Sequence, residues 1–223
     1  MWWDLDVTRP VPATIVLAVI LALPLAACGT EPEPADEERR DATSEAPDAV
    51  PGADDDDPCD LLADDAAAEL AGEPIVESRR AAVGGLPVCQ MRGDESFVQV
   101  AQVPATAWAE TVPDLIDELR TNGALDTTNQ ARAEDVATRL AAGEYDGLGA
   151  CELFSAMAEF NGTAPGQKRT VAYVPDGLAP QGISAQSCVD GTYASVFLVR
   201  PGIVVGDDIA ALMETTLEVV ATS

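Results

Sequence analysis

The chain has 223 residues, with 39 acidic and 12 basic side chains, no histidine and a formal net charge of −27. This acidic balance argues against nucleic-acid binding, which needs a basic surface, and against electrostatic adhesion to anionic lipids. Without histidine the chain can form neither a Ser-His-Asp or Cys-His catalytic arrangement nor a histidine metal site. We therefore expect no nucleic-acid partner, no cofactor and no metal.

The N-terminus is typical of a lipoprotein signal peptide. An apolar run over 13–25 has the length of a signal-peptide core and is shorter than the about 20 residues that a membrane-spanning helix needs. The run ends in Leu25-Ala26-Ala27-Cys28, where small residues precede a cysteine as in a lipobox. We predict that residues 1–27 are removed and that acyl chains such as palmitate on Cys28 anchor the protein at the extracytoplasmic face of the cell membrane. The alternative is an ordinary secretory signal.

The first residues do not fit such a signal. The segment 1–6 carries two aspartates, whereas a signal peptide begins with positive charge. We expect translation to start at Val7, which leaves Arg9 as the basic residue. The alternative is an atypical signal that begins at Met1.

Residues 29–58 have the composition of a disordered acidic tether. They hold twelve acidic residues, five prolines and one large apolar residue, Val50, so burial cannot offset the entropy of ordering them. With the lipidated Cys28, this segment forms the predicted linker over 28–58. A net charge of −26 remains once residues 1–27, with two aspartates and one arginine, are removed.

The rest of the chain, 59–223, is predicted to be one secreted α+β domain in which a pattern occurs twice. In the first half we expect a helix over 59–72, strands over 74–83, 86–91 and 96–103, and a helix whose capping box is 111–114. In the second half we expect a helix over 151–162, strands over 169–174, 183–189 and 193–199, and a last helix capped by Asp207 or Asp208. A helix over 131–142 with an Asp135–Arg139 pair joins the halves.

This order predicts an antiparallel sheet with helices packed on one face. The halves, 59–122 and 151–223, are possible repeats from an internal duplication. Convergence of two similar units is the alternative.

The cysteines follow the same order in both halves. Cys28 is assigned to lipid, and the remaining four are separated by 30, 62 and 37 positions with no Cys-x-x-Cys, which argues against a redox or zinc motif. An exported chain of this kind forms structural disulfides. Because each half places one cysteine at a helix start and one in a strand, we predict Cys59–Cys89 and Cys151–Cys188.

At Asp57-Pro58-Cys59-Asp60-Leu61-Leu62 the chain resembles a family of uncharacterised actinobacterial lipoproteins. Its members carry a lipobox, an acidic or Ser/Pro-rich tether and a domain that opens with Pro-Cys-x-Leu-Leu. A second cysteine follows at about the distance of Cys89, commonly with an aromatic residue two positions on, where this chain has Met91. The resemblance covers the lipobox, the tether and residues 57–103. It implies a lipoprotein and brings no catalytic residues.

No catalytic motif is present in the sequence. There is no Gly-x-Ser-x-Gly elbow, P-loop or Gly-x-Gly-x-x-Gly fingerprint. A Ser–Lys mechanism could use only Lys168, which the sequence places in a turn. Paired carboxylates for glycoside hydrolysis stay open, although aromatic platforms are scarce. We expect a membrane-anchored, non-catalytic domain that binds an envelope component, a partner protein or a small ligand.

The alternative is a carrier that shields a small apolar ligand between sheet and helices. Its candidate lining residues are Leu153, Met157, Phe160, Val196, Phe197 and Leu198, although the ordinary interpretation of these residues is plain core. Trp108 is either an exposed recognition anchor or, as we expect, packed on the sheet. The sequon Asn161-Gly162-Thr163 is expected only to end a helix.

Overall fold

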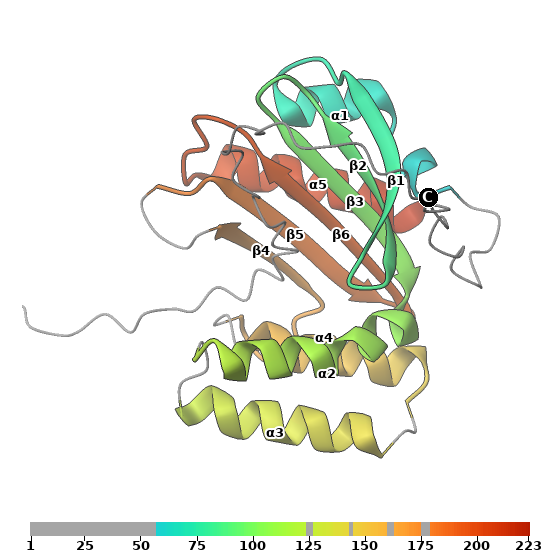
Figure 1. Ribbon diagram of the computed structural model, residues 1–223, viewed down its shortest axis with the longest axis vertical. Coiled ribbons are helices and arrows are strands. Elements are labelled where there is room, and N and C mark those ends of the chain that lie inside the picture. Colours follow the sequence, from blue (N-terminus) through green and yellow to red (C-terminus); the bar gives the residue numbers. More distant parts are fainter. Residues whose placement is uncertain (1–56, 124–126, 143–144, 160–162, 175–178) are drawn as a thin grey trace, which may run out of the picture.

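The structure is a computed structural model that describes residues 57–123, 127–142, 145–159, 163–174 and 179–223. The predicted signal peptide, Val7, Cys28 and the tether up to residue 56 lie outside these residues. One six-stranded sheet forms the centre, with all neighbouring strands antiparallel in the order β1-β2-β3-β6-β5-β4 (Figure 1). The strands are β1 (Glu77–Val83), β2 (Leu86–Arg92), β3 (Phe97–Pro104), β4 (Arg169–Val174), β5 (Gly182–Val189) and β6 (Thr192–Val199).

The helices form two groups around this sheet, which confirms the α+β class. They are a short 3-10 helix η1 (Pro58–Asp60), α1 (Asp64–Ala71), α2 (Ala105–Thr121), α3 (Thr127–Ala141), α4 (Gly147–Ala158) and α5 (Asp207–Thr222). The expected packing on one face holds for α1 and α5. The group α2–α4 instead gathers at one end of the sheet, against the other face (Figure 1). No helix in the described ranges is long and apolar enough to cross a membrane.

The two faces of the sheet carry different side chains, because successive residues of a strand point to opposite sides. One face, here called the core face, carries fully buried aliphatic residues that pack against α1 and α5. Its central members are Val98, Val100, Ile183, Val196 and Leu198, together with Leu70 of α1 and Met213 and Leu217 of α5. The other face, here called the pocket face, carries the residues between them, such as Gln99, Ala101, Ser195 and Phe197.

Two tight turns fix the register of the hairpins. Gly84 and Gly85 join β1 to β2 with φ values of 59° and 83°, and Asp190 and Gly191 join β5 to β6 with φ values of 51° and 82°. Two-residue turns with positive φ match the twist of antiparallel strands and favour Gly and Asp. The sequence therefore specifies both turns locally.

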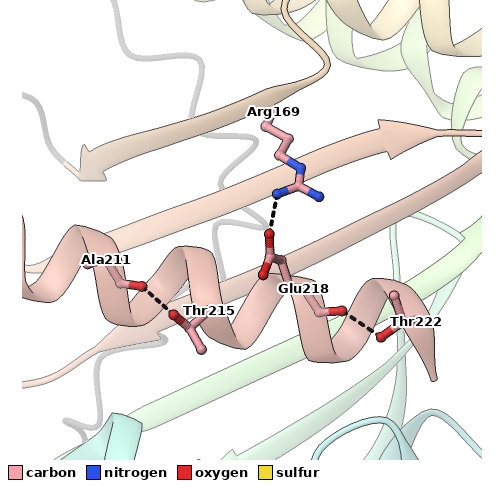
Figure 2. Close-up of polar contacts among 5 residues, drawn as sticks. All are labelled: Arg169, Ala211, Thr215, Glu218 and Thr222. Atoms are coloured by element: carbon pink, nitrogen blue, oxygen red, sulfur yellow. Dashed lines mark hydrogen bonds and ion pairs between the residues drawn. The ribbon is translucent and has the colours of Figure 1, made fainter.

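Helix α5 runs along the core face behind β5 and β6 (Figure 1). It also contacts the edge strand β4. Arg169 of β4 donates to Glu218 of α5 at 2.7 Å, and the hydroxyls of Thr215 and Thr222 donate to the carbonyls of Ala211 and Glu218 (Figure 2). The ion-pair side chains are 53% and 60% exposed, so solvent screens the pair and its contribution to stability is small.

Both predicted disulfides are confirmed. Cys59–Cys89 joins η1 to β2 on the core face, and Cys151–Cys188 joins α4 to β5 on the pocket face, with Cα–Cα distances of 4.8 and 5.1 Å. The strand order reads the same from either edge inward, as a duplication would give. However, halves whose central strands β3 and β6 are antiparallel are related by a two-fold axis perpendicular to the sheet. Such a rotation would place both disulfides on the same face, whereas they lie on opposite faces. The duplication stays a prediction.

The predicted capping box at 111–114 is wrong, because α2 begins six residues earlier, at Ala105. Trp108 and Ala109 are buried, and their packing extends the helix ahead of Pro113, which lies inside it. The Thr111 hydroxyl donates to the Trp108 carbonyl at 2.7 Å instead of capping a helix.

Four other helix details also differ from the expectations. The helix predicted over 59–72 is divided into η1 and α1, because Ala63 between them is in an extended conformation. The N-cap of α5 is Gly206, with no side-chain cap. Arg139 pairs with Glu152 of α4 at 3.6 Å rather than with Asp135, because α3 packs beside α4. Helix α4 begins at Gly147, four residues before Cys151, and Asp146 caps it by accepting from the N–H of Gly149.

Candidate binding pocket

A cavity of about 240 Å³ lies between α2 and the pocket face of the sheet. Ligand pockets typically range from about 300 to 1,000 Å³, so this cavity lies just below that range and has room only for a small molecule. Strands β2, β3, β5 and β6 form its floor, α2 forms one wall, and the β1–β2 hairpin reaches its edge. It is lined by Val83, Gly84, Leu86, Val88, Gln99, Ala101, Trp108, Thr111, Asp114, Leu115, Glu118, Ser184, Gln186, Tyr193, Ser195 and Phe197.

Helical spacing brings the α2 residues to the cavity. Trp108, Thr111, Leu115 and Glu118 follow each other by three or four positions, and Asp114 lies beside them, so one helix face supplies all five. Trp108 is buried, whereas Asp114 and Glu118 are exposed at the rim. The α2 wall is therefore apolar at its start and acidic towards its end.

The floor is unusually polar for the middle of a sheet. Gln99 is 6% exposed and lies at the inner end of a hydrogen-bonded row of side chains. Arg79 Nη2 donates to Gln90 Oε1 at 2.6 Å, and Gln90 Nε2 donates to Gln99 Oε1 at 3.3 Å. The Gln99 amide nitrogen has no partner among the described residues. Its N–H groups are therefore available to a ligand in the cavity.

The β5 side of the floor adds hydroxyl and amide groups. Ser184 is 7% exposed and accepts from Gln186 Nε2 at 3.1 Å. Ser195 of β6 lies next to Gln186 in the sheet and also lines the cavity. A few fixed polar groups among apolar side chains are what a ligand pocket uses to orient its ligand.

An aromatic cluster closes one end of the cavity. Trp108 stacks on Tyr193 with ring centroids 5.4 Å apart, and Phe154 of α4 meets Trp108 edge-on at 5.6 Å. Burial of Tyr193 raises its pKa to about 12, against a hydrogen bond with Ser195 that lowers it. The hydroxyl is therefore a neutral hydrogen-bonding group at physiological pH.

The charge of the lining has one sign. Asp114 and Glu118 have no ion-pair partner within the part of the chain that the structure describes. The described residues that line the cavity include neither lysine nor arginine. Chemically, the arrangement can accept an apolar body, hydrogen bonds and a positive charge.

The predicted carrier residues fall mostly outside this cavity. Leu153 and Met157 of α4 are buried in the helical cluster, and Val196 and Leu198 are buried on the core face. Only Phe197 lines the cavity, and Phe160 lies outside the described residues. Trp108 is packed on the sheet, as expected, and 5% exposed.

Lys168 and Thr163, which the sequence also singled out, are not among the residues that line the cavity. Lys168 is exposed in the turn before β4, where its carbonyl accepts from the N–H of Cys188. In the sequon, Asn161 and Gly162 lie outside the described residues, and the N–H of Thr163 donates to the carbonyl of Ala158. Within the described ranges, no group of three or more metal-binding side chains occurs.

The sequence does contain a signal for the polar floor. Ser184 and Gln186 alternate along β5, so the sequence alone places them on one sheet face, and the strand register adds Gln99 and Ser195 to that face. A strand buried on both sides would carry apolar residues there. This pattern indicates a face that does not form a plain core.

A second hollow lies under the loop between β6 and α5. It has a volume of about 590 Å³ and is lined by residues that include Arg200, Ile203, Asp208 and Leu212. Val204 and Val205 of this loop are 74% and 51% exposed.

No family model, curated protein or solved structure matches the chain.

Proposed function

We propose that the protein is a membrane-anchored, extracytoplasmic lipoprotein whose domain binds a small ligand, without catalysis, in the cavity between α2 and the sheet. The observation that carries this proposal is the cavity itself, with its buried polar floor of Gln99 and Ser184. Burying polar side chains is costly unless they are hydrogen-bonded, and a ligand can use the Gln99 N–H groups that the protein leaves free.

The arrangement of the carboxylates favours binding over hydrolysis. Glycoside hydrolysis needs two carboxyl groups on opposite sides of the bond that is cut. Asp114 and Glu118 both come from α2, one helical turn apart. They can hold a ligand at the rim but cannot flank a substrate from two sides.

The proposed anchor is compatible with this site. The chain enters the domain at Asp57, and Cys59 is joined to Cys89 on the core face. The cavity opens on the opposite face of the sheet. The predicted tether over 28–58 would reach roughly 30 Å as a flexible chain and hold the domain clear of the bilayer.

The anchor has its own test. Cys28→Ser should move the protein from the membrane fraction to the soluble fraction, because it removes the acylated thiol. Membrane association that persists in this variant would refute lipidation at Cys28.

The ligand is tested by comparing native and denatured masses of the exported Cys28→Ser protein with its disulfides intact. We expect an additional mass of a few hundred daltons or less that denaturation removes. Ala101→Leu, which projects into the cavity, should abolish it, whereas Ala82→Leu on the exposed edge of β1 should not. A bare mass in the parent protein, together with no binding of small amphiphiles, would refute the proposal.

A second function, recognition of an envelope partner, is supported by the exposed loop at Val204 and Val205. The loop lies at the start of α5, and the other end of this helix contacts the start of the domain through Ser223 and Leu61. The 16 residues of α5 span about 24 Å, so the loop and Leu61 lie near opposite ends of this helix. Val204→Ser with Val205→Ser should abolish a specific cross-link in intact cells, and Val219→Ser should not.

A further inference from the structure

The charge of the cavity narrows the class of ligand that the proposed function involves. Every charged side chain in its lining is a carboxylate, and both carboxylates belong to the exposed end of α2. An anion entering this cavity would lose hydration without gaining a positive partner. Anionic ligands are therefore disfavoured, which leaves neutral and cationic ones.

The two carboxylates distinguish between these remaining classes. Asp114 and Glu118 are four residues apart on one helix face, where like charges repel each other. Neither has an ion-pair partner among the described residues. On the same helix Asp117 does have one, because Arg120 lies 3.1 Å from it. A cation at the rim would relieve the repulsion that the protein itself leaves uncompensated.

The rest of the lining suits an apolar body. Leu86, Val88, Leu115 and Phe197 supply aliphatic and aromatic surface below the rim, and the ring of Trp108 closes one end. A cavity of about 150 Å³ can hold benzene, so 240 Å³ accommodates an aromatic ring with a short charged chain.

We propose that the cavity binds a small amphiphilic cation, with its ammonium group beside Asp114 and Glu118 and its apolar body against Leu115 and Phe197. This inference rests on the proposed function, since it names the ligand class of the same cavity. The Gln99 N–H groups add a donor that would orient an acceptor atom on the ligand.

The test uses three probes with one phenylethyl body and different charge: 2-phenylethylammonium, 2-phenylethanol and 3-phenylpropionate. Their affinities for the oxidised, full-length Cys28→Ser protein are measured by calorimetry at neutral pH and low salt. We expect the cation to bind tightest and the anion weakest, with roughly tenfold or more between them. Added salt should reduce this difference, because the rim is open to solvent.

Matched variants assign the preference to the rim. Asp114→Asn with Glu118→Gln should weaken binding of the cation by roughly three- to tenfold, as expected for two exposed carboxylates, and leave the alcohol unchanged. Glu110→Gln with Asp117→Asn removes the same charge from α2 outside the cavity and should preserve the preference.

The outcomes separate the two proposals. If the alcohol binds as tightly as the cation and Ala101→Leu abolishes both, the cavity binds small molecules but the inference about charge is wrong. An equal effect of the two double variants would also overturn it, because general electrostatics would then explain the preference. If none of the probes binds at millimolar concentration and native mass spectrometry finds no ligand, both proposals fail.

Discussion

Removing each disulfide separately tests how the two faces of the sheet divide stability from function. The double variants are Cys59→Ala with Cys89→Ala, and Cys151→Ala with Cys188→Ala. The bridges close loops with sequence separations of 30 and 37 residues. Loop-closure entropy then gives losses of about 3.6 and about 3.8 kcal/mol in the free energy of unfolding. Since domains have about 5–15 kcal/mol in total, a moderately stable domain stays folded in either variant.

The two double variants should lose similar free energy of unfolding but should differ in their effect on the cavity. Cys151–Cys188 ties α4 to the pocket face, and Phe154 of the same helix packs against Trp108 of the cavity wall. Cys59–Cys89 ties η1 to the core face, away from the cavity. We expect only the loss of Cys151–Cys188 to loosen the aromatic cluster and weaken ligand binding.

Urea unfolding followed by far-ultraviolet circular dichroism measures the two energies, and near-ultraviolet circular dichroism without urea reports on the aromatic cluster. The expected result is similar losses of stability with a weaker near-ultraviolet signal in Cys151→Ala/Cys188→Ala alone. Losses below about 1 kcal/mol would refute the loop-entropy estimate. Equal near-ultraviolet changes in both variants would refute the division of roles between the faces.

Three further predictions address single positions. Because burial raises the pKa of Tyr193 from 10.0 to about 12, the folded protein keeps this proton where the unfolded chain loses it. The free energy of unfolding should therefore fall by about 1.4 kcal/mol per pH unit between about pH 10 and 12, and Tyr193→Phe should remove this fall in urea titrations. In Gly147→Ala the new Cβ would lie 2.8 Å from Gly191 Cα, so we expect the free energy of unfolding to fall by about 1–3 kcal/mol. In the control Gly206→Ala the new Cβ meets nothing within 4 Å, and an equal loss of stability in both variants would contradict this reasoning. Glu218→Gln should change stability by less than about 1 kcal/mol despite its short contact with Arg169, because both side chains are exposed; a larger loss in thermal unfolding would show that the pair is not screened.

The position of the candidate site could be predicted only in part. The carrier hypothesis assigned a ligand to the space between sheet and helices, and Phe197 does line the cavity. Leu153 and Leu198 do not, because α4 and the core face bury them in separate clusters. Most of the apolar residues in that hypothesis belong to the core clusters, whereas polar residues such as Ser184 and Gln186 of β5 form the cavity floor.

Features that depend on neighbours along the chain are specified locally and could be predicted from the sequence. Alternating strands and turns such as Gly84-Gly85 specify hairpins through local backbone geometry. The matching order of the cysteines in the two halves, one in a helical segment and the next in a strand, predicted the two disulfides. Tertiary structure decided what covers each face of the sheet, because alternation separates the faces without saying which helix packs on them. The burial of Trp108 against Tyr193 sets where α2 begins, and that helix, placed over Gln99, encloses the cavity.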